Sequence, residues 1–254
     1  MSQRALITGG ASGIGLGLAR RFAAQGDRVA LCDADGDAVE RVAAEMPDAI
    51  CMKADVTDAG QMDAFLSQVE DSWGGVDVVC ANAGTGGPAG RIEDLNYDAW
   101  QACLAVNLNG AFLTCRWAAR IMRAQKSGCI VITSSTSGQW GHPYRSPYAA
   151  AKWGLVGLTK TLAMELGPVG VRVNAICPGA VEGDRMDRVV AMEAKASNRP
   201  EQDVRDQYVR GVSMRTWVTV DDLADTVLFL ASPAASKISG QIIAIDGHTE
   251  TNAP

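Results

Sequence analysis

Short apolar runs alternate with longer amphipathic stretches along nearly the whole chain of 254 residues. Near-continuous apolar runs separated by helical patterns are typical of a parallel β-sheet that is covered on both faces. The sequence therefore predicts an α/β fold, a doubly wound, seven-stranded parallel sheet with helices on both faces. The expected strands are residues 4–9, 28–33, 49–55, 76–84, 129–135, 171–179 and 241–246, and the expected helices include 14–25, 58–73, 96–124, 148–166 and 221–231.

No internal repeat, low-complexity tract or linker divides the sequence, which indicates a single domain over residues 1–254. One charged segment, at about residues 182–215, interrupts the alternation after the sixth expected strand. Open α/β sheets bind ligands outside the carboxyl ends of their strands. We therefore expect this segment to form a substrate lid. The sequence TVDD at 219–222 has the spacing that caps the start of a helix.

Charge and composition exclude several classes of function. The formal net charge is -6 and no basic run is present, which argues against nucleic acid as a partner. No stretch reaches the roughly 20 apolar residues of a membrane span. The first residues lack a signal peptide, so we expect a cytoplasmic protein with no membrane contact. The seven cysteines form no CxxC pair and His142 and His248 are the only histidines, so we expect no metal site, disulfide or Ser-His-Asp triad.

The first expected strand ends in a glycine-rich turn that contains Gly9, Gly13 and Gly15. Glycine tolerates positive φ and has no Cβ, so the backbone at such a turn can approach a ligand closely. The helix that follows presents free N–H groups and the positive end of its dipole, which favour an anion. A strand, a glycine turn and a helix in this order predict a site for the pyrophosphate of a dinucleotide.

Asp33 ends the second expected strand. A carboxylate at this position can accept hydrogen bonds from the ribose hydroxyls of adenosine, and it would repel a 2′-phosphate. The neighbouring positions Ala11 and Ala34 supply no cation for such a phosphate. The sequence therefore favours NAD over NADP, although an aspartate here could also cap a loop.

The sequence YAAAK places Tyr148 and Lys152 four residues apart in an expected helix. Such positions lie on one face, about 5–6 Å apart. A neighbouring ammonium lowers the pKa of a phenol from its ordinary value of about 10, so this tyrosine could exchange protons near neutrality. Taken alone, the same pattern suits a surface helix with a solvated lysine.

Seven motifs in order identify what the chain resembles. They are TGGASGIG at 8–15, DV at 55–56, NAG at 82–84, VNLNG around Asn107, SS ending at Ser135, YAAAK at 148–152, and PG at 178–179. The chain is similar over essentially its whole length to the classical short-chain dehydrogenase/reductase family. The resemblance implies a Rossmann-like fold and an enzyme that acts on CH–OH groups.

The resemblance also implies roles for individual residues. Tyr148 is expected to be the general acid/base, and Lys152 to lower its pKa and bind the nicotinamide ribose. Ser135 is expected to hold the substrate oxygen. Asn107 is expected to bind a water that links Lys152 to solvent, although an asparagine within a helical pattern can also kink it. The implied cofactor residues are Gly9, Ser12, Gly13, Ile14, Gly15, Asp33, Asp55, Val56, Asn82, Ala83, Gly84, Tyr148, Lys152, Pro178, Gly179 and Val181.

Two positions depart from the family pattern. The family commonly has threonine four residues after the PG glycine, where it bonds the nicotinamide carboxamide, but this chain has Gly183. The backbone of Val181 is an alternative source of that bond. Trp153, directly after the lysine, is bulkier than the small residue expected there, and it could serve core packing or an oligomer face.

The loops expected around the cleft are polar, which predicts a small hydroxylated or anionic substrate. We expect NAD-dependent hydride transfer to or from a polar secondary alcohol or its ketone, of the polyol, sugar or hydroxy-acid class. The alternatives are a 3-oxoacyl thioester reductase, which usually uses NADPH, and a sensor or scaffold without catalysis. The resemblance further implies a homotetramer. The candidate substrate residues are Arg91, Ser135, Gln139, His142, Arg145, Tyr148, Arg185 and Arg188.

Overall fold

A computed structural model describes residues 2–250, apart from the side chains at 184, 185, 192, 193 and 195–197. Its described strands form one parallel sheet of seven, in the order β3-β2-β1-β4-β5-β6-β7, which confirms the expected fold class. The strands are β1 (Arg4–Thr8), β2 (Arg28–Asp33), β3 (Ile50–Lys53), β4 (Val78–Ala81), β5 (Gly128–Thr133), β6 (Val171–Pro178) and β7 (Ile242–Ile245).

The strand order reverses at β1, which pairs with β2 on one side and with β4 on the other. The connections that leave β1 and β4 therefore diverge to opposite halves of the sheet and open a crevice beyond the carboxyl ends of these strands. The glycine turn follows β1 and residues 82–84 follow β4, so the order of the strands brings these two motifs to one place.

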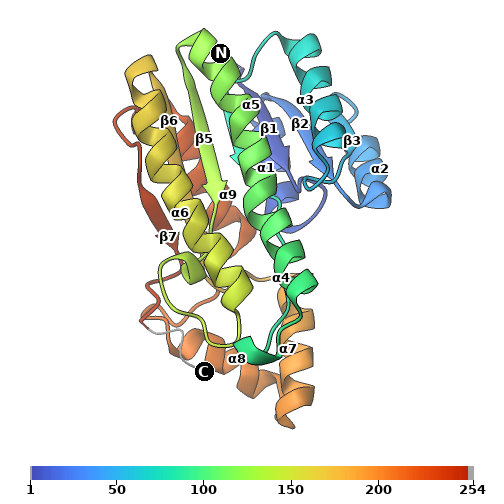
Figure 1. Cartoon of the computed structure of the whole chain (residues 1–254), viewed down its shortest axis with the longest axis vertical. Helices are drawn as coiled ribbons and strands as arrows, with labels where there is room; N and C mark the ends of the chain where they lie inside the picture. Colours follow the sequence, from blue (N-terminus) through green and yellow to red (C-terminus); the bar gives the residue numbers. More distant parts are fainter. Residues whose placement is uncertain (1, 251–254) are drawn as a thin grey trace.

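Helices cover both faces of the sheet. Phe22, Val42 and Val227 come from three helices and pack in one buried cluster. Phe65 and Met122 belong to the buried cluster on the other face. In Figure 1, α5 and α6 lie in front of the sheet and α9 lies behind it. The first face carries α1 (Gly13–Ala24), α2 (Gly36–Glu45) and α9 (Val220–Ala231), and the second carries α3 (Ala59–Trp73), α5 (Gly110–Gln125) and α6 (Ser146–Leu166).

Local sequence sets the helix ends. The Asp58 side chain accepts hydrogen bonds from the N–H groups of Gly60 and Gln61 at the start of α3. Thr219 and Asp222 form the expected reciprocal capping box at the start of α9. Short single-turn helices are η1 (Ile92–Asp94), η3 (Thr136–Gly138), η4 (Gly167–Val169) and η5 (Pro233–Ala235). No helix in the described part of the chain has the length and apolar character needed to cross a bilayer.

The helix expected over 96–124 is present but contains a π-helical turn that the sequence did not predict. The structure has α4 (Tyr97–Leu104), a π-helical turn η2 (Ala105–Asn109), and then α5. The wider turn contains Asn107, whose side chain donates to the carbonyl of Cys103 one turn back, at 2.9 Å. A local π turn of this kind is frequent at functional sites.

The charged segment after β6 forms two helices, α7 (Asp184–Ser197) and α8 (Glu201–Arg210). Val190, Ala194 and Val204 are buried against each other, with Tyr208 and Trp217 packed beside them. Both helices lie beyond the carboxyl ends of the strands (Figure 1). The segment therefore has a small core of its own next to the crevice.

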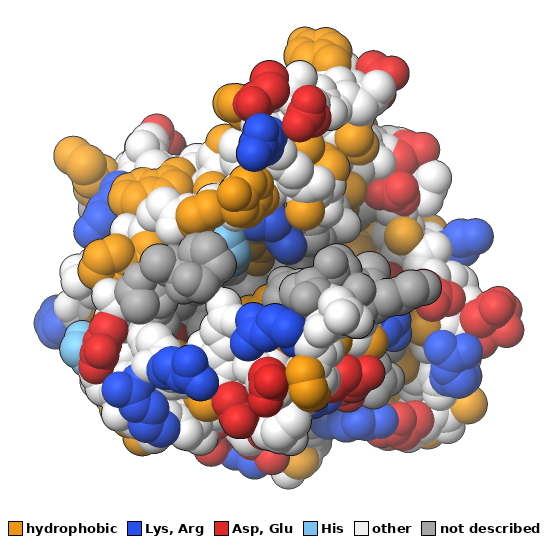
Figure 2. All heavy atoms as spheres, turned by 90° about the horizontal axis from the view of Figure 1, so that it is seen from below, with side chains coloured by type: hydrophobic (Ala, Val, Ile, Leu, Met, Phe, Trp, Pro, Cys, Tyr) orange, Lys and Arg blue, Asp and Glu red, His pale blue; other side chains and the backbone are white. Residues whose placement is uncertain are grey.

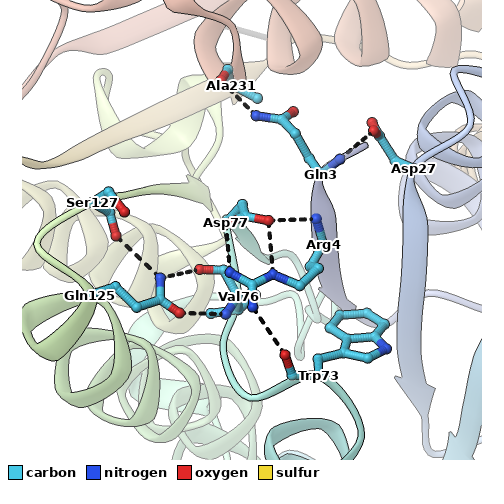
Figure 3. Close-up of polar contacts among 9 residues, drawn as sticks. All are labelled: Gln3, Arg4, Asp27, Trp73, Val76, Asp77, Gln125, Ser127 and Ala231. Carbon is cyan, nitrogen blue, oxygen red and sulfur yellow. Dashed lines mark hydrogen bonds and ion pairs between the residues drawn. The ribbon is translucent and has the colours of Figure 1, made fainter. Parts of the chain in front are cut away.

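The opposite end of the sheet is held by polar contacts (Figure 3). The Arg4 guanidinium donates to both oxygens of Asp77, from Nε at 2.9 Å and Nη2 at 2.8 Å, and also to the carbonyl of Trp73. Burial raises the pKa of Asp77, but the hydrogen bonds from Arg4 outweigh it and leave this pKa below its ordinary value. The Gln125 side chain donates to the carbonyl of Val76 and accepts from its N–H.

Candidate active site

The candidate site lies at the carboxyl ends of β1, β4, β5 and β6, which meet at one edge of the parallel sheet. Figure 2 shows the molecule from this side, and the surface is hollowed near its centre, with basic and hydrophobic side chains at the border. Most of the predicted motifs converge here because they directly follow a strand, whereas Asn107 and Tyr148 lie on helices.

The glycine turn has the shape of a cradle for an anion. Gly9 has φ 63° and Gly13 has φ 49°. A Cβ at Gly15 would lie 1.9 Å from the carbonyl oxygen of Gly9, and one at Gly9 would lie 2.8 Å from Cα of Ala83. A Cβ at Gly13 would meet no heavy atom within 4 Å. The turn is therefore closed toward the sheet and open on the outer side, at the N-terminus of α1. Ser12 is exposed there and Ile14 is half-buried.

Asn82 links the ends of three strands. Its Nδ2 donates to the carbonyls of Thr8 at 3.1 Å and Gly9 at 3.3 Å, and its Oδ1 accepts from the hydroxyl of Thr133 at 3.1 Å. The Thr8 hydroxyl in turn accepts from the N–H groups of Asn82 and Ala83. The side chain of Asn82 is thus engaged within the protein, and it fixes the position of Gly9 and of the following NAG residues.

Asp33 is held at the end of β2. Its Oδ2 accepts from the N–H of Ala11 at 3.1 Å, and its Oδ1 from that of Asp35 at 3.2 Å. Sequence reasoning missed a cation beside it: Lys53 is the register partner of Asp33 on β3, and its Cδ lies 3.1 Å from the Cβ position of Gly36. Pairing the second expected strand with the third in the sequence could have placed Lys53 beside Asp33.

Asp55 and Val56 stabilise local structure near the crevice. Oδ1 of Asp55 accepts from both the N–H and the hydroxyl of Thr57, each at 2.8 Å, so it caps the turn before α3. Val56 is buried, and its Cγ2 lies 2.6 Å from the position that a Cβ of Gly110 would take. A larger residue at Gly110 would therefore displace Val56.

Tyr148 and Lys152 lie on α6. Nζ of Lys152 is 5.5 Å from the centroid of the Tyr148 ring, and Cζ of Arg145 is 5.2 Å from it. Lys152 is only 3% exposed, and its Nζ donates to the carbonyl of Thr133 at 2.8 Å. The hydroxyl of Ser134 donates to the carbonyl of Lys152 at 2.9 Å. The end of β5 thus fixes this turn of the helix and directs the ammonium toward the sheet.

Asn107 is completely buried in the π turn. Its Nδ2 donates to the carbonyl of Thr85 at 3.0 Å, and its Oδ1 accepts from the N–H of Thr85 at 3.3 Å. A Cβ at Gly84 would lie 3.0 Å from Oδ1 of Asn107 and 3.5 Å from Nζ of Lys152. The structure therefore brings Asn107 and Lys152 against one glycine. The water that Asn107 is expected to bind stays a prediction.

Ser135 follows β5 and is 9% exposed. Its Oγ accepts from the N–H of Ser137 at 3.1 Å, and Oγ of Ser137 lies 2.7 Å from Nδ1 of His142. His142 therefore contacts a neighbour of Ser135 and holds the loop between β5 and α6.

Val181 follows the PG pair and bridges to Val218. This bridge uses the carbonyl of Ala180, at 2.9 Å, and the N–H of Glu182, at 2.8 Å. The N–H and carbonyl of Val181 consequently point away from Val218. Gly183 has φ 135° and its Cβ position is open. Pro178 ends β6, and the N–H of Gly179 donates to the carbonyl of Ile245.

The structure brings some of the candidate substrate residues together and leaves others apart. Gln139 and Arg145 are half-buried in the loop before α6. Nη2 of Arg145 donates to the carbonyl of Gly86 at 2.8 Å, which joins this loop to the one after β4. The remaining candidates are Arg91 and Arg188, which are exposed, and Arg185, whose side chain lies outside the described residues.

Two buried thiols lie near the site. Burial raises the pKa of Cys103, against the opposing effects of a hydrogen bond from Asn107 and the positive charges of Arg145 and Lys152. Burial likewise raises the pKa of Cys177. A thiol with a raised pKa is protonated near neutrality and is a poor nucleophile. These cysteines therefore pack as small apolar side chains.

Comparisons with known proteins agree with the geometry. A family model described as enoyl-(acyl carrier protein) reductase matches residues 9–248. The chain is 36% identical over 248 residues to D-beta-hydroxybutyrate dehydrogenase of Cupriavidus necator, covering 96% of each. The chain belongs to the short-chain dehydrogenase/reductase family. The family resemblance expected from the sequence is confirmed, and the protein is an oxidoreductase with a nicotinamide cofactor.

Solved structures of short-chain dehydrogenase/reductase proteins superpose on the whole chain. An NAD+-bound xylitol dehydrogenase matches with a TM-score of 0.90 and 30% identity, over 96% of this chain and 98% of that one. An actinorhodin polyketide ketoreductase variant with NADPH matches with a TM-score of 0.92 and 31% identity, over 97% and 96%. The family thus includes proteins of this shape that hold either form of the cofactor.

Proposed function

We propose that this enzyme transfers a hydride between NAD and the carbinol carbon of a polar secondary alcohol, of the polyol, sugar or hydroxy-acid class. The observation that carries the proposal is the position of Tyr148, whose ring has the Lys152 ammonium 5.5 Å from its centroid, on a helix turn fixed to the end of β5. The names of the relatives, a hydroxybutyrate and a xylitol dehydrogenase, support this substrate class.

The roles follow from what alcohol oxidation requires. A carbinol must lose the proton of its hydroxyl as hydride leaves its carbon, so a base must lie near that oxygen. Tyr148 is the proposed base, and the ammonium of Lys152 stabilises its phenolate. The hydroxyl of Ser135 donates to the substrate oxygen and stabilises charge that develops on it. NAD supplies the hydride acceptor when it is bound. Asn107 keeps the segment at Thr85 in place beside Lys152.

The residues present fit a dinucleotide. The cradle at Gly9, Gly13 and Gly15 accommodates the pyrophosphate, and Asp33 accepts from the adenosine ribose. Lys152 would bind the nicotinamide ribose. The N–H and carbonyl of Val181, which point away from Val218, would bind the nicotinamide carboxamide in the absence of the family threonine.

NAD rather than NADP is the proposed cofactor because of Asp33. Two of its four lone-pair sites are used by Ala11 and Asp35, and the charge would repel a 2′-phosphate. Lys53, its neighbour on β3, is the feature that would favour NADP. Initial rates with NADH and NADPH decide between them, and a preference for NADPH would refute this part of the proposal.

A second candidate is reduction of a 3-oxoacyl thioester. The description of the family model and the structural similarity to a polyketide ketoreductase favour it. This reaction would run with NADPH, so the same cofactor comparison, followed by assay of a 3-oxoacyl thioester, separates the two candidates.

We further propose a cytoplasmic homotetramer of single-domain subunits. Trp153 is 49% exposed on α6, which excludes core packing within the subunit. Phe112 on α5 and Met164 on α6 are also exposed, at 49% and 80%. Large exposed apolar side chains on two adjacent helices suit a subunit contact. Light scattering would measure the mass, and a monomer would contradict this assembly.

The central experiment is a screen of NAD reduction across polyols, sugars, hydroxy acids and neutral aliphatic alcohols. The proposal expects the fastest turnover among the polar classes. A marked preference for aliphatic alcohols would refute the proposed substrate class, and an unchanged rate in Tyr148→Phe would refute the proposed base.

A further inference from the structure

Two buried polar atoms in the described part of the chain have no hydrogen-bond partner, and they are neighbours in the sequence. They are Nε of Arg145 and Oγ of Ser146. Buried polar side-chain atoms are nearly always bonded, so such atoms need an explanation. Both lie at the start of α6, the helix that carries Tyr148.

Arg145 also has no anionic partner among the described residues. None of the ion pairs found among residues 2–250 includes it. The one hydrogen bond that its side chain makes to a described residue goes to the neutral carbonyl of Gly86. Arg4, which is also partly buried, contrasts with it because it donates twice to the carboxylate of Asp77. A half-buried cation without an anion is costly unless a ligand supplies the opposite charge.

The guanidinium lies where a substrate would be. Its Cζ is 5.2 Å from the ring centroid of Tyr148. Nζ of Lys152 is 5.5 Å from the same centroid, so the two cations lie close to one ring. The first turn of α6 adds main-chain N–H groups without intrahelical partners and the positive end of a helix dipole.

We propose that the substrate carries an oxyanion, bound by Arg145 and Ser146 at the start of α6, while its hydroxyl lies at Tyr148. The inference rests on the proposed function and narrows it from polar alcohols in general to hydroxylated anions. A carboxylate, a sulfonate and a phosphate share the required chemistry. Arg145 donates from its guanidinium, and Ser146 donates from its hydroxyl. The oxyanion is only a few bonds from the carbinol carbon, because Arg145 is in contact range of the Tyr148 ring.

Entry of the anion requires local opening. Two contacts join the loop after β4 to the loop before α6: Arg145 to Gly86, and the N–H of Gly90 to the carbonyl of Tyr144, at 2.9 Å. Nε of Arg145 and Oγ of Ser146 are buried in this closed arrangement. The bound anion would replace the carbonyl of Gly86 as the partner of the guanidinium.

The test compares charged substrates with a neutral one of the same size. NAD reduction is measured with 3-hydroxybutyrate, 2-hydroxypropanesulfonate and glycerol 3-phosphate, and with 3-hydroxybutyramide as the neutral analogue. The variants are Arg145→Ala, Arg145→Lys and Ser146→Ala, and Arg41→Ala on α2 removes the same charge from an exposed distant position. For the preferred anion we expect Arg145→Ala to raise KM about 10- to 100-fold, with partial rescue by lysine. The amide should be turned over equally by the wild type and Arg41→Ala, and Arg145→Ala should raise the KM of the amide far less than that of the anion.

The outcomes separate the inference from the proposed function. The inference fails, while the proposed function stands, if the wild type prefers the amide or if Arg145→Ala impairs amide and anion alike. If no alcohol reduces NAD, the proposed function fails, and the anion site is then tested by binding instead of by turnover. Acetate, methanesulfonate and inorganic phosphate are then added at constant ionic strength, and the melting temperature is recorded. The site is supported if the anions raise the melting temperature of the wild type and of Arg41→Ala but not that of Arg145→Ala. Equal behaviour of the two variants overturns it.

Discussion

The two ends of the central sheet differ in how their polar groups are paired. At the amino end, Arg4 and Asp77 satisfy each other, and Gln125 is bonded on both sides of its amide to Val76 (Figure 3). At the carboxyl end, Arg145 has no carboxylate partner and Nε of its guanidinium has no partner among the described residues. The polar groups at the amino end of the sheet thus bond to each other, whereas the carboxyl end has donors available to a ligand.

The direction of the chain explains part of this difference. Each helix that follows a parallel strand begins near the carboxyl ends, so free N–H groups and positive dipole ends gather there. α1 begins at the glycine turn after β1. Main-chain donors near the carboxyl end can therefore serve a ligand, whereas Arg4 and Asp77 at the amino end bind each other and stabilise the fold. Substitutions at the two ends should consequently change different properties of the protein.

The largest expected effect is the loss of turnover in Tyr148→Phe. Removal of the proposed base should lower kcat about 1,000-fold, while the melting temperature stays close to the wild-type value. Steady-state NAD reduction and thermal unfolding measure the two properties. Tyr97→Phe, which removes a hydroxyl from a side chain that is 69% exposed, is the matched control and should leave both unchanged. A large fall in melting temperature for Tyr148→Phe would show that the carboxyl end also serves stability.

A smaller change is expected in cofactor preference. Asp33→Ser should lower kcat/KM for NADH about 10-fold, because the charged acceptor for the adenosine ribose is lost. It should raise kcat/KM for NADPH by a similar factor, because the repulsion of a 2′-phosphate disappears. Lys53→Ala is the matched variant on the neighbouring strand and should lower the use of NADPH instead. If Asp33→Ser keeps the wild-type ratio of the two cofactors, the hydrogen bonds of Asp33 to Ala11 and Asp35 are its whole role.

The sequence predicts the fold better than it predicts the site. The apolar runs that alternate with helical patterns were sufficient to predict the sheet, because strands buried on both faces must be apolar along their length. The order of the strands then places the cation of Lys53 beside Asp33, and no local pattern in the sequence shows this. The π turn at Asn107 was also not predicted within the helix expected over 96–124, because the helical spacing of apolar residues continues on either side of it. The unpaired donors of Arg145 and Ser146 become visible only in the folded chain, where no described residue accepts a hydrogen bond from them.

At the amino end, Asp77→Asn should lower the free energy of unfolding by about 1–3 kcal/mol, because a partly buried carboxylate that accepts three hydrogen bonds from Arg4 loses its charge. Chemical denaturation measures this loss, and kcat/KM should stay at the wild-type value. Asp63→Asn is the control: Asp63 is 68% exposed and lies 3.8 Å from Arg116, so its loss should change stability little. Equal effects of the two variants would contradict the special role of the Arg4 pair.

The smallest expected effect is the pH dependence of that same pair. The folded pKa of Asp77 is lowered, so the unfolded state binds its proton more readily, near an ordinary value of about 3.9. The stabilisation is therefore fully present above that value and is lost as pH falls through the lowered folded pKa. Denaturation curves between neutral pH and the acid limit of folding should show wild type and Asp77→Asn converging only below about pH 4. Arg4→Met removes the cause of the lowered pKa, so its stability should fall less steeply in that range. If its acid dependence matches that of the wild type, groups other than the Arg4–Asp77 pair control acid stability at this end of the sheet.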